Sequence, residues 1–290
     1  MAIIVLQGAD FSANNIGKID IFQGFSATTK AVFSRIGIVE DETNQMQLAV
    51  NSFINSLVAA GIWGNGKITA LCLPFLANLT TNPTLAKAVK NVIVDNDDFF
   101  ASSYTSLSLT GNGLQPISGS PIAGIPYYSA NRGTWQNFHY ANYYLSPITN
   151  MPVSGVDVYS ADFRPNLVCI NETNNAFFMT GSNRAYMDGN YQYQPAMRIV
   201  CYKSDLNNGR GVAYCNGQKV LSINSDVNSD LGNIASIGFG GYEAVYGNER
   251  NYLNVPSAII SVGGYLSDSE AEVYTNAANA LVEAIRMYMN

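Results

Sequence analysis

The chain has 290 residues, of which 47% are hydrophobic and only 12% are charged, about half the usual charged share of roughly a quarter. This composition excludes a disordered chain and a coiled coil. With 15 basic against 21 acidic residues the net charge is −6, so there is no basic surplus to bind nucleic acid or an anionic membrane surface.

The first 25 residues are apolar, are punctuated by Gly and Asn, and match neither a helical nor a regular sheet pattern. They lack the flanks of a signal peptide, and no stretch of the chain reaches the ~18 apolar residues of a membrane span, so no membrane insertion is expected. An exposed apolar strand tends to pair with another chain. We therefore expect residues 1–25 to form an assembly or anchoring arm, with extra strands of the same domain as the alternative. The residues expected to make its contacts are Ile3, Ile4, Val5, Leu6 and Phe11.

Two helices are predicted next. Apolar side chains recur every three or four positions over residues 41–60, where Asp41 is a possible N-cap and Gly61 ends the run. A shorter helix is predicted over residues 27–36. We expect residues 26–62 to form a helical segment that packs on the rest of the fold.

After this segment the period changes from 3.6 to 2, and short apolar runs alternate with turn residues. Eleven such runs without intervening helices predict antiparallel sheets and exclude a parallel one. The predicted strands cover residues 67–76, 104–110, 138–145, 153–159, 167–171, 176–180, 197–203, 211–215, 219–223, 234–239 and 258–262.

The strongest turn signal is Asn216-Gly217, because both residues can adopt the positive φ of a type I′ turn, so a two-residue hairpin is expected there. Residues 63–290 are expected to form one all-β sandwich of two antiparallel sheets, with the helices covering an edge or an end. The chain should end in a helix that starts at Ser267, where Glu270 completes a capping box.

Four cysteines stand without any C-x-x-C spacing and with a single histidine in the chain, which argues against a zinc site. We expect Cys72, Cys169, Cys201 and Cys215 to be buried, reduced packing residues. Cys201 and Cys215 lie in neighbouring strands, and whether they face each other depends on the register.

The residue patterns of catalysis are missing. No carboxylates recur with the period-2 spacing that a glycosidase sheet needs, and there is neither a Gly-x-Ser-x-Gly elbow nor a P-loop. His139 lies in a run that alternates like a strand, so we expect a sheet histidine whose hydrogen bonds are satisfied. The acidic run 40–42 fits a helix start, and Asp95, Asp97 and Asp98 fit a solvated turn better than a calcium loop. We expect no catalytic residue, no cofactor and no metal.

Two loops, at 182–194 and 241–252, are rich in aromatic and amide side chains. Sugars are held by aromatic faces and by amide and carboxylate groups, but interface loops use the same residues. Glycan contact, protein contact and plain surface therefore all stay open. The candidate ligand-binding residues are Tyr186, Asp188, Asn190, Tyr191, Tyr193, Tyr242, Tyr246 and Asn248.

Three stretches carry a family resemblance. Gly8-Ala-Asp-Phe-Ser-Ala-Asn-Asn-Ile-Gly-Lys-Ile resembles a segment of bacteriophage virion proteins. The helix followed by Leu57-Val-Ala-Ala-Gly-Ile-Trp-Gly and Lys67-Ile-Thr-Ala-Leu-Cys-Leu-Pro-Phe, and the ending with a strand, Gly264-Tyr-Leu-Ser-Asp-Ser-Glu-Ala and a helix, are similar to phage structural proteins with a concanavalin A-like, laminin-G-type domain. The resemblance implies a concanavalin A-like β-sandwich (jelly roll) with N-terminal helices and a C-terminal helix.

The same resemblance implies a non-enzymatic virion component, on a tail, fibre or head surface, that assembles in the host cytoplasm with other virion proteins and with itself. A second hypothesis is an adhesin that binds host surface glycan through the two loops. A third is a polysaccharide-degrading enzyme, which the missing catalytic patterns disfavour.

Overall fold

The computed structural model describes residues 24–95, 98–101, 107–111, 113–116, 126–129, 137–145, 152–158, 165–170, 176–180, 183–186, 196–203, 210–224, 234–239 and 257–289. The expected contact residues of the arm, Ile3, Ile4, Val5, Leu6 and Phe11, lie outside these ranges, and the arm stays a prediction.

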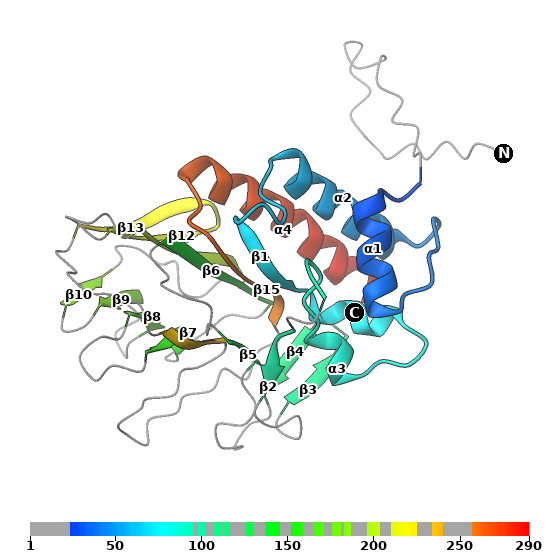
Figure 1. Cartoon of the computed structure of the whole chain (residues 1–290), viewed down its shortest axis with the longest axis horizontal. Helices are drawn as coiled ribbons and strands as arrows, with labels where there is room; N and C mark the ends of the chain where they lie inside the picture. The colour runs from blue at the N-terminus through cyan, green and yellow to red at the C-terminus, as the bar shows by residue number, and fades with distance from the viewer. Residues whose placement is uncertain are drawn as a thin grey trace, which may run out of the picture.

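Two antiparallel sheets form the body of the molecule (Figure 1). In sheet A the strands run in the order β13-β12-β11-β6-β15-β4-β3. A further strand of this sheet, β1, lies outside this order and pairs with residues 260–263 of β15. Its strands are β1 (Ile68–Cys72), β3 (Leu107–Thr110), β4 (Gly113–Pro116), β6 (Asn137–Tyr144), β11 (Ala196–Lys203), β12 (Arg210–Cys215), β13 (Gln218–Asn224) and β15 (Ser257–Gly263).

Sheet B has the order β10-β9-β8-β7-β14-β5-β2. Its strands are β2 (Phe100–Ala101), β5 (Pro126–Ser129), β7 (Pro152–Val158), β8 (Pro165–Ile170), β9 (Ala176–Thr180), β10 (Asn183–Tyr186) and β14 (Ile234–Phe239). All eleven predicted strands form, although β2, β4, β5 and β10 were not predicted. The structure confirms a mostly antiparallel β fold with flanking helices, and the concanavalin A-like jelly roll stays a prediction.

The helices are α1 (Ala27–Ile36), α2 (Gln45–Ala59), the single turn α3 (Leu85–Ala88) and α4 (Asp268–Tyr288). The predicted capping box is confirmed, because Ser267 Oγ accepts from the Glu270 amide and the Glu270 carboxylate accepts from the Ser267 amide. Gly37 ends α1 at φ 82°, a conformation that a residue without Cβ adopts at low cost.

Two predicted boundaries were wrong. Asn44, not Asp41, caps α2, since its side chain accepts from the next two free amides. Asp41 instead accepts from the amide and hydroxyl of Thr43, which closes a turn ahead of the helix. The strand predicted over 67–76 ends at Cys72, because Pro74 cannot donate to a strand ladder and begins a 3₁₀ helix (η1, Pro74–Leu79).

The prediction that the helices cover an edge or an end was also wrong: they cover a broad face of sheet A. α2 and α4 lie over this face in Figure 1, with sheet B on the opposite side of sheet A. Phe53 of α2 and Tyr274 of α4 have ring centroids 6.3 Å apart and pack with Tyr143 and Ile199 of the sheet. The helices take this position because the strand side chains on that face are apolar.

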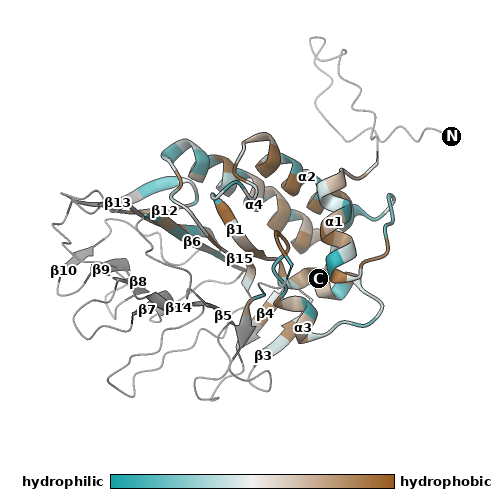
Figure 2. Cartoon of the chain, in the orientation of Figure 1, coloured by the Kyte–Doolittle hydropathy of each residue, from teal (hydrophilic) through white to brown (hydrophobic). Residues whose placement is uncertain are grey.

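Sheet A is therefore a middle layer. Along β6, Ala141 and Tyr143 belong to the helix-side core, whereas Tyr140 and Asn142 alternate onto the other face and are also buried. Figure 2 shows β1 as an apolar strand beneath the helices, as a strand buried on both faces should be.

The predicted hairpin at Asn216-Gly217 is confirmed, with φ of 54° and 78°. The register also settles how two cysteines lie. Cys201 pairs with Val212 and belongs to the helix-side core, whereas Cys215 pairs with Arg198, so these cysteines do not face each other. Cys72, Cys201 and Cys215 are buried and free, as predicted.

Candidate functional site

Most of the predicted ligand residues lie outside the described part of the chain. Tyr186 is the last residue of β10 and pairs with Phe177 of β9, while nothing is described of its side chain. The prediction of a loop over 182–194 was therefore wrong at its start, because residues 183–186 form the strand β10, which lies against β13 of sheet A. The residues that fall outside the described ranges are Asp188, Asn190, Tyr191, Tyr193, Tyr242, Tyr246 and Asn248.

A cluster of charged and aromatic side chains lies where α4 begins, and we name it the α4-start cluster. The β12-β13 hairpin contributes two members, the connection before α4 one, and α4 itself two, while a lysine before β1 completes the set. Its members are Lys67, Tyr214, Lys219, Tyr265, Asp268 and Glu270.

Asp268 is the centre of this cluster. Its Oδ1 accepts from the Tyr214 hydroxyl at 2.6 Å, and its Oδ2 lies 2.6 Å from Lys219 Nζ. Hydrogen bonds from Lys219 and then Tyr214 lower the pKa of Asp268, so the carboxyl is ionised at neutral pH. Burial and the bond to Asp268 raise the pKa of Tyr214, which keeps its hydroxyl protonated.

The hairpin geometry explains why these two donors meet one carboxylate. Tyr214 and Lys219 are cross-strand partners, so their side chains share a face, and the register shifts next to Tyr214. Such a bulge bends the strand and changes the direction of its side chains. Gly217 at the hairpin tip lies beside Glu272 and Thr275 of α4, which holds the hairpin on the helix.

A second ion pair flanks the first. Lys67 Nζ lies 3.0 Å from Glu270 Oε2 and donates to the Tyr265 carbonyl at 3.0 Å. Burial raises the pKa of Glu270, but bonds from Ser267 and Lys67 outweigh it and lower the pKa overall. These two contacts tie Lys67, which precedes β1, to the connection before α4.

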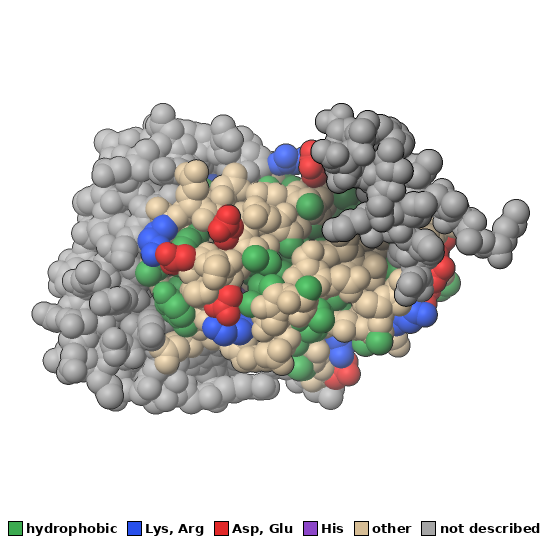
Figure 3. Space-filling view, turned by 90° about the horizontal axis from the view of Figure 1, so that it is seen from above, with side chains coloured by type: hydrophobic (Ala, Val, Ile, Leu, Met, Phe, Trp, Pro, Cys, Tyr) green, Lys and Arg blue, Asp and Glu red, His purple; other side chains and the backbone are tan. Residues whose placement is uncertain are grey.

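The polar heads of the cluster face solvent. The side chain of Asp268 is 65% exposed and that of Lys219 is 41% exposed, and Tyr265 is half-buried. Figure 3 shows the helix-covered face, on which charged side chains are few and often stand as adjacent acidic and basic groups with apolar groups nearby. An ionised carboxylate, an ammonium and an aromatic ring presented together have the chemistry to hold a polyhydroxylated ligand.

Behind the cluster lies His139, a fully buried residue of β6. Its Nδ1 lies 2.6 Å from the Gly264 carbonyl, an acceptor, so Nδ1 carries the proton of the neutral ring. Nε2 has no hydrogen-bond partner in the described part of the chain. Burial lowers the pKa of His139 to about 4 and leaves it uncharged at neutral pH. The prediction of a sheet histidine is confirmed, but its ring is satisfied only at Nδ1 among the described residues.

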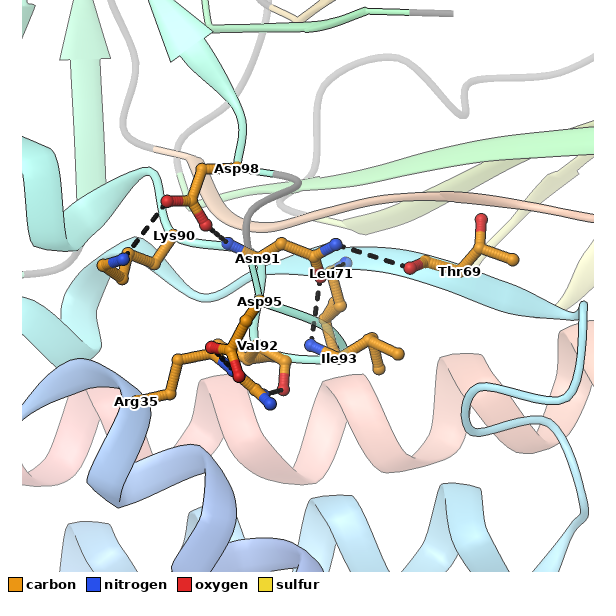
Figure 4. Close-up of polar contacts among 9 residues, drawn as sticks. All are labelled: Arg35, Thr69, Leu71, Lys90, Asn91, Val92, Ile93, Asp95 and Asp98. Atoms are coloured by element: carbon orange, nitrogen blue, oxygen red, sulfur yellow. Dashed lines mark hydrogen bonds and ion pairs between the residues drawn. The ribbon is translucent and has the colours of Figure 1, made fainter. Parts of the chain in front are cut away.

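A different polar cluster closes the outer edge of β1 (Figure 4). The buried Asn91 Oδ1 accepts from the amides of Leu71 and Ile93 at 3.1 and 3.0 Å, and its Nδ2 donates to the Thr69 carbonyl. The Val92 amide donates to the Leu71 carbonyl at 2.8 Å. Side chain and backbone thus replace the missing neighbour strand on this edge.

The acidic residues expected in a solvated turn have structural partners here. Asp95 Oδ1 lies 2.6 Å from Arg35 Nε, and the same arginine donates to the Val92 carbonyl. Asp98 accepts from the Asn91 amide at 3.0 Å and pairs with Lys90. The prediction of a solvated turn was therefore incomplete for Asp95 and Asp98, and Asp97 lies outside the described residues. In the part of the chain that is described, no group of three or more His, Cys, Asp or Glu side chains is arranged to hold a metal ion.

Sequence reasoning found the pieces of the α4-start cluster but not the cluster. It predicted both the capping box and the Asn-Gly hairpin, yet Tyr214 and Asp268 are 54 residues apart. No local spacing signals that the hairpin folds over the start of α4.

No model of a protein family matches this chain, and a search of curated proteins gives no match either. Among solved structures the chain is similar to a Trypanosoma rangeli sialidase in complex with 2,3-difluorosialic acid, with a TM-score of 0.51 and 12% identity over 80% of this chain and 38% of that one. It is also similar to the botulinum neurotoxin serotype D binding domain, with a TM-score of 0.50 and 11% identity over 76% of this chain and 52% of that one. The chain spans about two fifths to a half of these structures, and the likeness is one of fold.

Within the described ranges, no helix combines the length and the apolar content that crossing a bilayer requires.

Proposed function

We propose that this chain is a carbohydrate-binding β-sandwich module. The observation that carries the proposal is the likeness of fold, over more than three quarters of the chain, to a toxin binding domain and to a sialidase captured with a sialic acid derivative. Sialylated oligosaccharides are therefore the first glycans to test.

Binding without bond cleavage is the form of this function that the residues favour. The sequence lacks the period-2 carboxylate pair of a typical glycosidase sheet, although a sialidase uses a Tyr nucleophile and does not need that pair. The single histidine is fully buried and neutral. We therefore propose a recognition module in which aromatic, amide and carboxylate groups hold the sugar.

The test is a glycan array probed with the full chain, with a matched array whose sialic acids have been removed. We expect signal on at least one glycan, and loss of that signal after desialylation if a sialic acid is recognised. Substitution of the loop residues by Tyr191→Ala or Tyr242→Ala should weaken binding if the predicted loops contribute. Absence of signal on every glycan would refute the proposed function.

A virion structural role is the second proposal, and it rests on the sequence resemblance. Two of the stretches that carry the resemblance, Lys67 to Phe75 and the ending from the strand Ser257–Gly263 to Glu270, lie side by side through the β1-β15 pairing and the Lys67–Glu270 ion pair. Neither neighbour named above is a virion protein, so glycan binding comes first. Mass spectrometry of purified particles of the phage that encodes this chain would detect the chain if it is a virion component. Absence of the chain from those particles would rule this role out.

A further inference from the structure

We propose that the α4-start cluster is a sugar-binding surface, on which Asp268 and Lys219 bond neighbouring hydroxyls of one sugar residue while the Tyr265 ring lies against its C–H face. The proposal rests on the proposed function, because it names where on this chain a glycan binds. It places the site on the helix-covered face of sheet A, apart from the two loops predicted from the sequence.

The first argument is unused hydrogen-bonding capacity that faces solvent. Each carboxylate oxygen has two acceptor positions, and each Asp268 oxygen uses one of them, for Tyr214 or for Lys219. Lys219 gives one of its three N–H donors to Asp268. The remaining acceptors and donors lie side by side on side chains that are 65% and 41% exposed, which suits a pair of vicinal hydroxyls.

The second argument is preorganisation. Tyr214 is a buried residue of β12, so its hydroxyl holds the Asp268 carboxylate from below while leaving its outer side open. Tyr265 lies close enough to Tyr214 and Asp268 for both to shift its pKa, which places it beside the carboxylate. A ligand that meets groups already held in place loses less conformational entropy on binding.

The third argument separates a binding role from a purely structural one. Exposed ion pairs contribute little to stability, so the Lys219–Asp268 pair is not needed to hold α4 on the sheet. The buried core of Phe53, Tyr274 and their neighbours holds it. Removing the Lys219 charge should therefore change ligand binding far more than folding.

The experiment compares the full chain with Lys219→Met and Asp268→Asn, and uses Lys30→Met as the matched control. Lys30 forms an exposed ion pair with Glu40 at 3.6 Å on a different part of the helical layer. Each protein is tested on the glycan array, and the free oligosaccharide of the brightest wild-type spot is titrated by calorimetry. Thermal unfolding of every variant is measured in parallel.

We expect Lys219→Met and Asp268→Asn to weaken binding at least tenfold, with Lys30→Met within twofold of wild type. If Asp268→Asn unfolds, Lys219→Met alone decides. Binding by folded Lys219→Met that equals wild type would overturn the site and leave the proposed function standing, as would loss of binding confined to Tyr191→Ala and Tyr242→Ala. A wild-type array without signal would instead overturn the proposed function and this site with it.

Discussion

The segment at 90–98 and the α4-start cluster are built from the same side-chain types but use them in opposite ways. In the first, basic and acidic groups surround a buried residue, Asn91, whose side-chain amide bonds to backbone groups along the edge of β1 and in its own turn. In the second, a buried tyrosine holds an exposed carboxylate, and most of the polar surface faces water.

The difference shows that stability depends on which group is buried, not on the number of ion pairs. A buried amide that satisfies backbone N–H groups cannot be removed without leaving them unpaired. When one partner of an exposed ion pair is removed, water solvates the other partner and the free energy of unfolding changes little. The 90–98 segment should therefore be intolerant of substitution, whereas the surface of the α4-start cluster is free to serve a ligand.

The largest expected effect is that of Asn91→Ala. It removes the acceptor of the Leu71 and Ile93 amides and uncovers the edge of β1. At about 1–3 kcal/mol for each unpaired buried group, we expect a loss of about 3 kcal/mol in the free energy of unfolding, measured by urea denaturation. Exposed edges also pair between chains, so light scattering should show more association.

Asn55→Ala is the matched control for this substitution, because Asn55 is exposed on α2. It should change the free energy of unfolding by less than about 0.5 kcal/mol. A cost for Asn91→Ala as small as that of the control would show that Asn91 does not seal β1, and the contrast between the two regions would fail.

The next largest effect is a dependence of stability on pH that comes from His139. Its folded pKa of about 4 lies below the ordinary 6.5, so below pH 6.5 the unfolded chain binds a proton that the folded chain excludes. Stability should fall by roughly 2–3 kcal/mol between pH 7 and pH 4.5, at about 1.4 kcal/mol per pH unit. Lys67 and Glu270 are the charged groups nearest this ring, and their opposite charges largely offset each other.

His139→Gln isolates this contribution, since an amide can still donate to the Gly264 carbonyl and does not titrate. Urea denaturation at pH 7, 5.5 and 4.5 should show a much flatter profile for the variant. Carboxyl groups whose pKa is lowered in the fold, such as Asp268 and Glu270, also make the protein less stable as the pH falls, but mainly below pH 4.5. An unchanged slope above pH 4.5 would contradict the neutral, buried assignment of His139.

The two regions also differ in how far the sequence predicts them. The helix ends at Gly37 and Ser267 follow from capping chemistry, and the hairpin at Asn216 follows from its φ requirement, because all are local rules. The hydrogen bonds by which Asn91 covers the edge of β1 cannot be predicted from the sequence, since an Asn between Lys90 and Val92 equally suits an ordinary turn. Asp41 was mistaken for a cap because Asp and Asn cap equally well, and only the geometry of the turn decides between them.

The placement of the helices was unpredictable for a related reason. The side chains of a single strand with one apolar and one mixed face predict that only the apolar face is buried. That both faces of sheet A are buried becomes visible only when strands from distant parts of the sequence are placed side by side. Tyr140 and Asn142 carry polar groups, from which burial is not expected, yet both are buried. For the same reason the pairing of Tyr214 with Asp268 had no signal in the sequence.

A smaller effect is expected for Tyr214→Phe. It removes the donor to Asp268 but keeps the buried ring. Because water can replace the lost donor at the exposed carboxylate, the cost should be about 1 kcal/mol rather than the 1.5–3 of a buried charged hydrogen bond. Urea denaturation measures it, and calorimetry should show weaker binding of the array glycan. A loss of unfolding free energy close to that of Asn91→Ala would mean that the α4-start cluster serves to stabilise the fold.

The smallest effect on stability is expected for Lys219→Met, and its counterpart in the other region is Lys90→Met. Both remove one lysine from an ion pair with an aspartate, at 2.6 Å for Lys219 and 3.2 Å for Lys90. Distance alone would make the Lys219 pair the stronger, but Asp98 is less exposed than Asp268 and also accepts from the Asn91 amide.

We therefore expect Lys90→Met to lower the free energy of unfolding by about 1 kcal/mol, and Lys219→Met to lower it by less than about 0.5 kcal/mol. The effect of Lys219→Met should vanish in 0.5 M salt, because salt screens exposed charges. Denaturation at low and high salt measures both. The reverse order would mean that distance outweighs burial in this chain. The Lys219–Asp268 pair would then stabilise the fold. The argument that this exposed pair can bind a sugar without loss of stability would fail.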